Sequence, residues 1–392
     1  MSTSGGQTHP LHRVAIVGVA TTEMARRLDT TSAEISLRAA LTALDDAGLT
    51  PADVDGVVAR WPGPGGTVFQ PGSADWAEVF GQPLRWVCDT YPQGVPGALD
   101  AAAAVAAGLC EVALVFGGQA GVMGAAGVAD YTRPDNEFLA CWGSLTAAQF
   151  ALVAQVYRHR FGPDPEQVAA VAATIRNAGH RNPAAVMAGR GPYTAADVLA
   201  SPLVTEPFRL LDLCLATEGA AAMVITSIER ARDLPRPPVT ILGGGAEWHR
   251  QQYVNPPRYE EVWPLGADAA RRAFGLAGLT PADVDVFGLY DINTYEVIRQ
   301  FEMLGLCGEG EGAAYLAEVG IGLGGGHPTN TDGGLLSYAH IGWGGPTLKV
   351  VEAVRQLRGT AGGGQVPGAE VALVTGAGSG AQYHNVMILG RG

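Results

Sequence analysis

The chain is 392 residues long, 47% of them hydrophobic and 16% charged, and its formal net charge is −13. This length predicts two domain-sized halves around a large buried core, and the acidic balance without a basic stripe argues against nucleic acid as a partner. No apolar run reaches the roughly eighteen residues that a membrane span requires. The polar N-terminal stretch is expected to be a short disordered lead and not a signal peptide.

The cysteines and the single lysine limit the chemistry. Five cysteines are scattered along the chain without a CxxC pair, which indicates reduced thiols and a cytoplasmic protein and argues against disulfides and a zinc or other metal site. Lys349 is the only lysine among 25 basic residues. Schiff-base chemistry would therefore have one candidate amine, and its place inside a predicted helix counts against that role.

The first half of the chain alternates strands and helices. Apolar runs that end at glycine, at 14–20 and 112–118, are typical of buried parallel strands. Between them the sequence predicts a helix over 35–48, which ends at a capping glycine before Thr-Pro. A short apolar segment over 54–59 and a long helix over 95–109 complete a β-α-β-α-β order.

The region of about 119–236 interrupts this alternation. Apolar residues at helical spacing predict helices over 147–162 and 165–183. Residues 218–235 are expected to form a helix followed by a strand. The proline pair in RPPVT (236–240) marks the boundary with the second half.

The second half repeats the first. The nine residues AGLTPADVD occur at 47–55 and, letter for letter, at 277–285. The other matching segments of the second half are the strand 239–245, the helix 266–278, the apolar segment 284–291, the helix 345–359 and the strand 371–377. Matched pairs in one order, around 12–118 and 238–390, indicate an internal duplication of an α/β unit.

Two domains follow from this duplication. An N-terminal half is predicted over 12–236, with an inserted region at about 119–215, and a C-terminal half over 237–392. Ligands of open α/β sheets bind beyond the carboxyl ends of the strands, where helix N-termini present free N–H groups. The loops expected to carry the chemistry are therefore 88–97, 289–296 and 330–346.

Four motifs in this chain are similar to those of one superfamily. They are FRLLDLCLATEGAAAMV (208–224), YDINTYEVIRQFEMLGLCGEGEG (290–312), NTDGGLLS (330–337) and EAVRQLRG (352–359). Together they resemble the thiolase superfamily, in particular its sterol-carrier-protein-x-like branch with the lipid-transfer-protein-type aldolases; Glu218 stands where that branch has Asp. The resemblance covers nearly the whole chain. It implies an α/β thiolase-like fold, with two duplicated βαβαβ halves stacked as a five-layer α-β-α-β-α core.

The cysteines of thiolase acyl transfer are not retained. In that family a cysteine at a helix N-terminus attacks the thioester, because the helix dipole and backbone N–H groups stabilise the thiolate and the oxyanion. Here its position falls at Tyr91, with Cys88 three residues earlier, and the second cysteine position falls near Val374. The histidine of the family's GH-type motif corresponds to His340.

These differences favour a carbon–carbon lyase that acts on a CoA thioester. Retro-aldol cleavage of a β-hydroxyacyl-CoA needs a base, an acid and hydrogen-bond donors for the thioester oxygen, with no covalent intermediate, metal or other cofactor. The candidate catalytic residues are Tyr290 and His340, with Tyr338 and Tyr91 also lining the site. Tyr290 stands where thiolases of this branch carry a histidine, and we assign it as a donor. Each of the four also has a structural interpretation: Tyr290 would be an aromatic ring at a strand end bonded to backbone, His340 a histidine with its hydrogen bonds satisfied within the fold, and Tyr338 and Tyr91 residues without a catalytic role.

The remaining candidates would bind the substrate. Glycines in the late loops are expected to let the backbone approach the thioester or its pantetheine arm, and arginines of the insertion are candidates for the adenine end of CoA. These candidate binding residues are Gly325, Gly333, Gly334, Gly344, Gly378, Arg181 and Arg209. Asp291 is interpreted as fixing its loop, and His327 as structural.

Two alternatives stay open. A thiolase-like acyltransferase would need Cys88 to face the pocket, whereas a catalytically inactive subunit would bind acyl-CoA or support an active partner. The family resemblance further implies a homodimer and a small partner with a zinc ribbon and an OB-fold, of the DUF35 type. It also implies a steroid side chain as one substrate type.

Overall fold

The computed structural model describes residues 9–60, 72–89, 94–121, 146–250, 255–378 and 382–392. In these ranges the strands are β1 (Val14–Thr21), β2 (Gly56–Val58), β3 (Trp86–Cys88), β4 (Val112–Gln119), β5 (Leu203–Thr205), β6 (Phe208–Arg209), β7 (Gly219–Ser227), β8 (Val239–Trp248), β9 (Val286–Gly288), β10 (Val371–Gly378) and β11 (Tyr383–Arg391). The helices are α1 (Ser32–Ala47), α2 (Trp76–Phe80), α3 (Val95–Ala106), α5 (Thr146–Phe161), α6 (Pro165–Arg181), α7 (Ala195–Ala200), α8 (Ile228–Ala231), α9 (Tyr259–Val262), α10 (Ala267–Ala277), α11 (Thr294–Met303), α12 (Gly312–Val319) and α13 (Gly345–Arg358).

The strands of the two halves join edge to edge. Within the described residues they hydrogen-bond in the order β3-β2-β4-β7-β1-β8-β11-β10-β9, and a short antiparallel pairing of β1 with β8 links the halves. β2 is parallel to β3 and β4, and β9 is parallel to β10. β7 and β11 run antiparallel to their neighbours. Within each half, therefore, the parallel strands end at one edge: β2, β3 and β4 in the first half, and β9 and β10 in the second.

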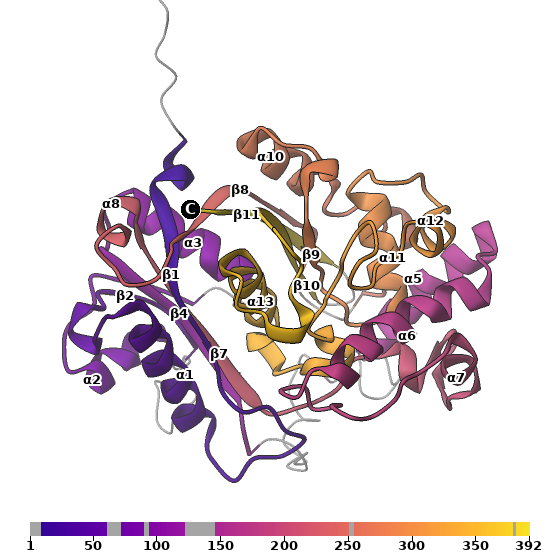
Figure 1. The fold of residues 1–392 in the computed structure, drawn as a ribbon, viewed down its shortest axis with the longest axis horizontal. Helices are drawn as coiled ribbons and strands as arrows, with labels where there is room; N and C mark the ends of the chain where they lie inside the picture. The colour runs from indigo at the N-terminus through magenta and orange to yellow at the C-terminus, as the bar shows by residue number, and fades with distance from the viewer. Residues whose placement is uncertain (1–8, 61–71, 90–93, 122–145, 251–254, 379–381) are drawn as a thin grey trace, which may run out of the picture.

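Helices separate and cover the two sets of strands. α3 and α13 pack on strands of both halves, so they form a central layer, and Figure 1 shows α13 between the two sets. α1 covers β1, β4 and β7 from outside, while α10 covers β8 and β11. Three hydrophobic cores fill the spaces between these layers. This α-β-α-β-α stacking confirms the predicted thiolase-like fold.

The repeated AGLTPADVD has the same structural role in each half. The helix before it ends at a left-handed glycine, Gly48 with φ 70° or Gly278 with φ 68°. The Thr and the first Asp of each copy form a capping box. The last residue, Asp55 or Asp285, accepts the two backbone N–H groups at the start of β4 or β10, at 2.9 Å each. One motif thus ends a helix and anchors the strand that leads to the site.

The outer helices sit directly on strand backbone. Gly18 in β1 and Gly243 in β8 hold equivalent places in the two halves. A Cβ at either would overlap a helix carbonyl oxygen, that of Ala43 in α1 or of Ala273 in α10. The absence of side chains at these glycines sets the spacing between helix and sheet.

The substitution Gly243→Ala tests this contact. Because the new methyl group must push α10 away from β8, we expect the free energy of unfolding to fall by about 2–3 kcal/mol or more. Gly275→Ala is the matched control: Gly275 lies on the exposed face of α10 with nothing within 4 Å of an added Cβ, so stability should rise by about 0.5–1 kcal/mol. Urea unfolding would measure both. Equal stabilities of the two variants would contradict the tight contact.

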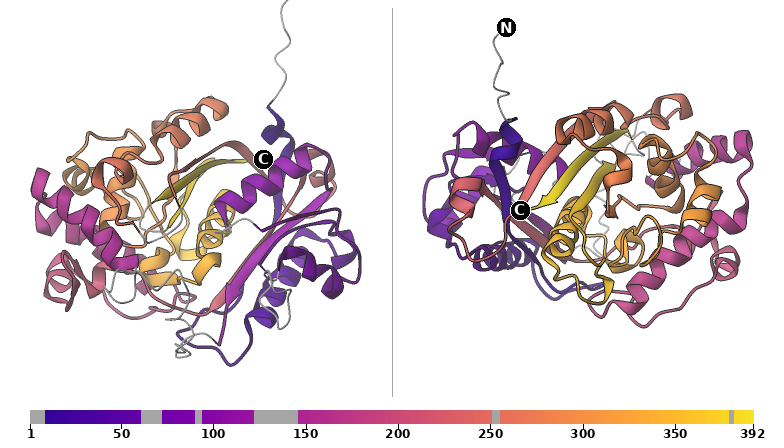
Figure 2. Two further views of the ribbon diagram at one scale, coloured as in Figure 1. Left: turned by 180° about the vertical axis from the view of Figure 1, so that it is seen from behind. Right: turned by 45° about the horizontal axis from the view of Figure 1, so that its top comes forward.

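The insertion packs on the C-terminal half. α5 and α6 match the two helices predicted over 147–162 and 165–183. α6 contacts α11, α12 and the turn Gly334–Tyr338, and its apolar face joins the outer core of the second half. Figures 1 and 2 show these helices on the side of the molecule away from α1 and α2. A segment that follows β4 in sequence thus shapes the loops of the other half.

The order predicted for 218–235 was wrong. These residues form the strand β7 followed by the short helix α8. The run of alanines suggested a helix because alanine has the highest helix propensity. In the structure β7 lies between β4 and β1 with helices on both faces, and small side chains let those helices approach. Tertiary pairing therefore overrides local propensity.

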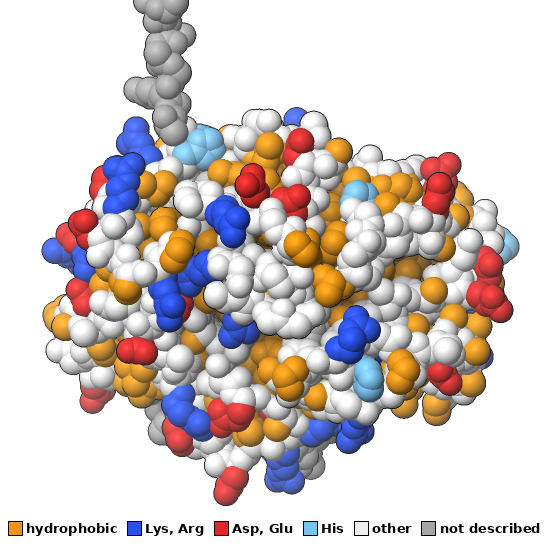
Figure 3. All heavy atoms as spheres, in the orientation of Figure 1, with side chains coloured by type: hydrophobic (Ala, Val, Ile, Leu, Met, Phe, Trp, Pro, Cys, Tyr) orange, Lys and Arg blue, Asp and Glu red, His pale blue; other side chains and the backbone are white. Residues whose placement is uncertain are grey.

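None of the described helices is long and apolar enough to cross a membrane. On the face drawn in Figure 3, the basic and acidic side chains are intermingled.

Candidate active site

The N-terminal ends of α3 and α13 meet in the central layer. Gly94, which caps α3, has φ 93°, and a Cβ there would lie 2.5 Å from the carbonyl carbon of Pro346. The end of β10 closes on both helices, since a Cβ at Gly376 would lie 3.6 Å from Cβ of Val95 and of Pro346. Thr347 Oγ1 is buried here with no hydrogen-bond partner among the described residues. Because helix N-termini carry free N–H groups and partial positive charge, this junction can hold an oxyanion.

The loop before α13 closes against β4. A Cβ at Gly344 would lie 2.6 Å from the carbonyl oxygen of Gly117, and one at Gly342 would overlap the amide of Gln119. Gln119 in turn donates to the carbonyl of Thr217 at 2.8 Å. The backbone of the second half is thereby fixed on the strand ends of the first.

His340 lies in this loop. Its N–H donates to Thr217 Oγ1 at 2.9 Å, and its carbonyl accepts from the Thr217 N–H at 3.1 Å and hydroxyl at 3.0 Å. The ring is near the start of α13, because a Cβ at Gly345 would lie 3.6 Å from His340 Cδ2. Burial lowers the pKa of His340 to about 4, and the nearby Lys349 charge acts in the same direction. The imidazole is therefore neutral near pH 7 and can accept or donate a proton.

Asp291 fixes the segment that leads to His340. Its carboxylate accepts the N–H groups of Leu335 at 2.9 Å and Leu336 at 3.3 Å, which start the π-helical turn Gly334–Tyr338. It also forms a buried ion pair with Lys349, with 2.6 Å between Nζ and Oδ1. These bonds agree with the loop-fixing role that we assigned to Asp291.

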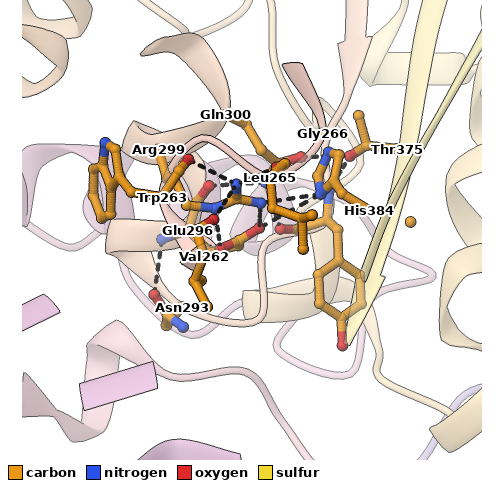
Figure 4. A network of polar contacts seen from close by, with 12 residues as sticks. Val262, Trp263, Leu265, Gly266, Asn293, Glu296, Arg299, Gln300, Thr375 and His384 are labelled. Carbon is orange, nitrogen blue, oxygen red and sulfur yellow. Dashed lines mark hydrogen bonds and ion pairs between the residues drawn. The ribbon is translucent and has the colours of Figure 1, made fainter. Parts of the chain in front are cut away.

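Hydrogen bonds hold the backbone of Tyr290 against β10. Its N–H donates to Thr375 Oγ1 at 2.8 Å, and its carbonyl accepts from Gln300 Nε2 at 2.9 Å. Gln300 Oε1 accepts from Thr375 Oγ1 at 2.5 Å, which closes a ring of contacts. Figure 4 shows Gln300 reaching toward Thr375.

The two described candidate tyrosines belong to different cores. Tyr290 packs in the outer core of the second half, and Tyr338 in the central layer. The Tyr338 hydroxyl lies 3.5 Å from Thr21 Oγ1 at the end of β1, and burial raises the pKa of Tyr338. Tyr91, the fourth candidate, lies outside the described residues. The catalytic roles of these tyrosines stay predictions.

Protein atoms fill the space beside each candidate glycine. Gly325 faces Gly320, Gly333 faces Gly179, Gly334 faces Asp291, Gly344 faces Gly117 and Gly378 faces Tyr383. Close packing within the protein thus accounts for the lack of a side chain at these positions. Their part in holding CoA stays a prediction.

The two candidate arginines line different clefts. Arg209 donates to the carbonyl of Ser201 at 2.9 Å and lines a cleft of about 430 Å³ in the insertion. Arg181, at the end of α6, borders a hollow of about 40 Å³ beside Asp332. Recognition of CoA by either arginine stays a prediction.

The described cysteines are poor nucleophiles. Burial raises the thiol pKa to about 12 in Cys110, Cys214 and Cys307. Cys88 lies on β3, with its Sγ 3.7 Å from Asp100 Oδ2 on α3, and a neighbouring carboxylate disfavours a thiolate. Cys141 lies outside the described residues. No cluster of three His, Cys, Asp or Glu side chains suited to a metal ion occurs in the described part of the chain.

A buried polar network beside the site was not predicted (Figure 4). Arg299 on α11 donates to both Glu296 carboxylate oxygens, at 2.7 and 2.9 Å, and to His384 Nδ1, at 3.0 Å. It also donates to three carbonyl oxygens between residues 262 and 265. The one signal for this network in the sequence is the Glu–Arg pair three residues apart in TYEVIRQ. The network ties α11 to β11 and to the chain before α10.

Comparisons with known proteins define the class of this fold. A family model described as "Thiolase C-terminal domain-like" matches residues 262–391. A solved structure titled "Ltp2-ChsH2(DUF35) aldolase" superposes with a TM-score of 0.84 at 30% identity, covering 97% of this chain and 98% of that one. The fold is therefore that of a thiolase.

Two relatives narrow the family. This chain is 35% identical to "17-hydroxy-3-oxo-4-pregnene-20-carboxyl-CoA lyase" from Mycobacterium tuberculosis, over 93% of this chain and 96% of the relative. It is 33% identical to "Steroid side-chain-cleaving aldolase" from Thermomonospora curvata, over 88% of this chain and 90% of that protein. The chain belongs to the thiolase superfamily, in its lipid-transfer-protein-type branch.

The pH dependence of stability tests the environment of His340. Since burial lowers the pKa of this residue below its unfolded value, the unfolded state binds more protons between about pH 6.5 and 4, and stability is lost as the pH falls through that window. We expect His340→Gln to lose about 2 kcal/mol less than the wild type between pH 7.5 and 5 in urea unfolding. The exposed His159→Gln variant should keep the wild-type slope. Parallel curves for all three proteins would contradict a buried neutral His340.

Proposed function

We propose that this protein is a CoA-thioester carbon–carbon lyase that cleaves a β-hydroxyacyl-CoA by a retro-aldol reaction. One observation carries the proposal. The two helix N-termini of α3 and α13 meet in a junction that can bind an oxyanion, while the positions of the two thiolase cysteines fall, by family resemblance, at Tyr91 and near Val374. A site of this kind can stabilise a thioester enolate but lacks the sulfur that would take up an acyl group.

The residues divide the reaction between them. A base removes the proton of the β-hydroxyl group, the Cα–Cβ bond breaks, and its electron pair passes to the thioester as an enolate. The N–H groups at the starts of α3 and α13 hold the enolate oxygen. His340, neutral near pH 7, transfers protons, and Tyr290 donates a hydrogen bond. Protonation of the enolate carbon then releases a shorter acyl-CoA and a ketone or aldehyde, so no cofactor beyond the CoA thioester is required.

The substrate and partners follow from the relatives. Names that specify steroid side-chain cleavage support a steroid β-hydroxyacyl-CoA as the substrate. The solved aldolase that contains a DUF35 partner supports a complex with a small OB-fold and zinc-ribbon protein. A homodimer and a cytoplasmic location complete the proposal.

The geometry disfavours the two alternatives. Acyl transfer by Cys88 would need a thiolate, yet its sulfur lies against the carboxylate of Asp100. A neutral histidine beside a helix N-terminus, with the preceding turn anchored by Asp291, supports a working active site over an inactive acyl-CoA-binding subunit.

Site variants test the lyase assignment. With a steroid β-hydroxyacyl-CoA as substrate, we expect His340→Gln and Tyr290→Phe to lower kcat by about 10²-fold or more with a smaller change in KM, because each removes a proton-transfer or donor group. Tyr315→Phe is the matched control and should retain activity. The Tyr315 hydroxyl lies 2.7 Å from His327 Nε2, and this contact is not part of the junction of α3 and α13. Wild-type kcat values in both site variants would show that His340 and Tyr290 take no part in the reaction.

Cysteine chemistry separates lyase from transferase. We expect treatment with iodoacetamide, and the substitution Cys88→Ala, to leave cleavage intact because no step passes through sulfur. Intact-mass analysis of the untreated protein during turnover should show no acyl adduct on the chain. An acyl adduct on any cysteine would instead establish acyl transfer.

A further inference from the structure

The only lysine of the chain is buried beside the site. Of 25 basic residues 24 are arginines, so the chain uses lysine once. Lys349 is 1% exposed, and its Nζ lies 2.6 Å from Oδ1 of Asp291, which is 0% exposed. Burying both charges costs several kcal/mol per ion before their attraction is counted. A pair this costly, with its lysine near the start of α13, calls for a structural or functional role.

The ion pair supports the turn that leads to His340. The Asp291 carboxylate receives the N–H groups of Leu335 and Leu336 while it contacts Lys349. Gly334 has φ 58°, and a Cβ there would overlap the same carboxylate. Two N–H groups and an ammonium on one carboxylate match an ionised acid, because a protonated acid would bring its own hydrogen to one of these contacts. Burial, with a smaller contribution from Asp332, raises the pKa of Asp291 above its ordinary value, and Lys349 and the Leu335 N–H limit that rise.

The duplication supplies an internal comparison. Both central helices begin with the pattern Gly-x-Pro, at Gly94 and Gly344. Counting from these glycines, the position of Lys349 in α13 is that of Leu99 in α3. Leu99 packs its methyl groups against Gly244 in β8. An aliphatic side chain therefore serves packing at this helix position in one half, and the other half places a charge there.

A covalent role for Lys349 does not suit the reaction. A Schiff base assists an aldol cleavage by replacing the carbonyl beside the carbon that becomes the carbanion. In the proposed reaction that carbonyl is a thioester, which does not form an imine while remaining a thioester. The amine is moreover held by Asp291.

We propose that Lys349 is a positioning residue of the lyase: its ammonium keeps Asp291 ionised, and this carboxylate holds the turn Gly334–Tyr338 so that His340 faces the thioester. The inference rests on the proposed lyase function only where it concerns catalysis. The ion pair and its effect on the turn can be tested independently of that function. The other charged groups that face the pair are Asp332, Arg176 and Glu352. Lys349 also places a positive charge near His340, which favours the neutral imidazole.

The charge of Lys349 can be observed directly. Because the chain contains one lysine, labelling with ¹⁵N-lysine gives a single Nζ resonance. We expect an ammonium signal protected from exchange at pH 7, and its protection should be lost in Asp291→Asn. A neutral amine at pH 7, or a rapidly exchanging ammonium in the wild type, would overturn the proposal.

Substitutions test the positioning role by two measurements. In Lys349→Met we expect faster amide hydrogen exchange at Leu335 and Leu336. We also expect kcat to fall at least about tenfold with KM nearly unchanged, because a small displacement of a proton-transfer group is costly. The acid limb of the kcat/KM profile should move to higher pH, since His340 loses a neighbouring cation. A lysine without influence on His340 would leave that limb in place, and the fall in kcat and the faster exchange at Leu335 and Leu336 report on the turn itself.

The double variant Lys349→Met/Asp291→Asn is the control for misfolding. It removes both charges, so it should be more stable than Lys349→Met, which leaves a buried carboxylate unpaired. It should still show reduced kcat and the shifted acid limb. Wild-type kcat in the double variant would overturn the proposal. If the wild type itself shows no cleavage, the proposed function fails, while the Nζ resonance and hydrogen exchange still decide whether Lys349 fixes the turn.

Discussion

The meeting of two buried helix N-termini is the constraint on which the rest of this structure depends. The first N–H groups of a helix have no partners within it and are costly to bury unpaired. α3 and α13 bring such groups together between two sets of strands, at Gly94 and Pro346. The fold gives this arrangement its rigidity, because each helix packs on strands of both halves. A ligand with a developing negative charge would offer these N–H groups hydrogen-bond acceptors.

The sequence pattern predicted most of this framework. The duplicated AGLTPADVD located the helix ends, and the paired apolar runs located the strands β1, β4, β8 and β10. The parallel pairing expected of these runs was wrong for β1 and β8, which pair antiparallel with both of their neighbours. It placed the strand within 218–235 after a helix instead of before one, and it missed β11. The Ala-rich run of β7 has the composition of a helix, and only its place between two strands makes it extended. Such pairing joins residues two hundred positions apart, as with β1 and β7, and no local pattern contains it.

The site was predictable only in part, for the same reason. His340 and the loop-fixing role of Asp291 follow from motifs that stand in the sequence. Lys349 was set aside because its helix looked regular. Lys349 pairs with the carboxylate of Asp291, which lies 58 residues away in the chain. The sequence does not show that these two groups are neighbours. The contact of Arg299 with His384 spans 85 residues and was missed likewise.

The two halves share one architecture but differ in the charged groups that surround the site. Equivalent glycines, capping boxes and strand-anchoring aspartates occur in both halves, where they set the spacing of helix and sheet. The charged groups around the junction are unequal: the second half has Lys349 where the first has Leu99, and it alone supplies Asp291 and His340. An enolate forms at one carbon and needs proton transfer from one direction. A symmetric junction can bind its oxygen, but only an asymmetric set of acids and bases can act on a single face of the substrate.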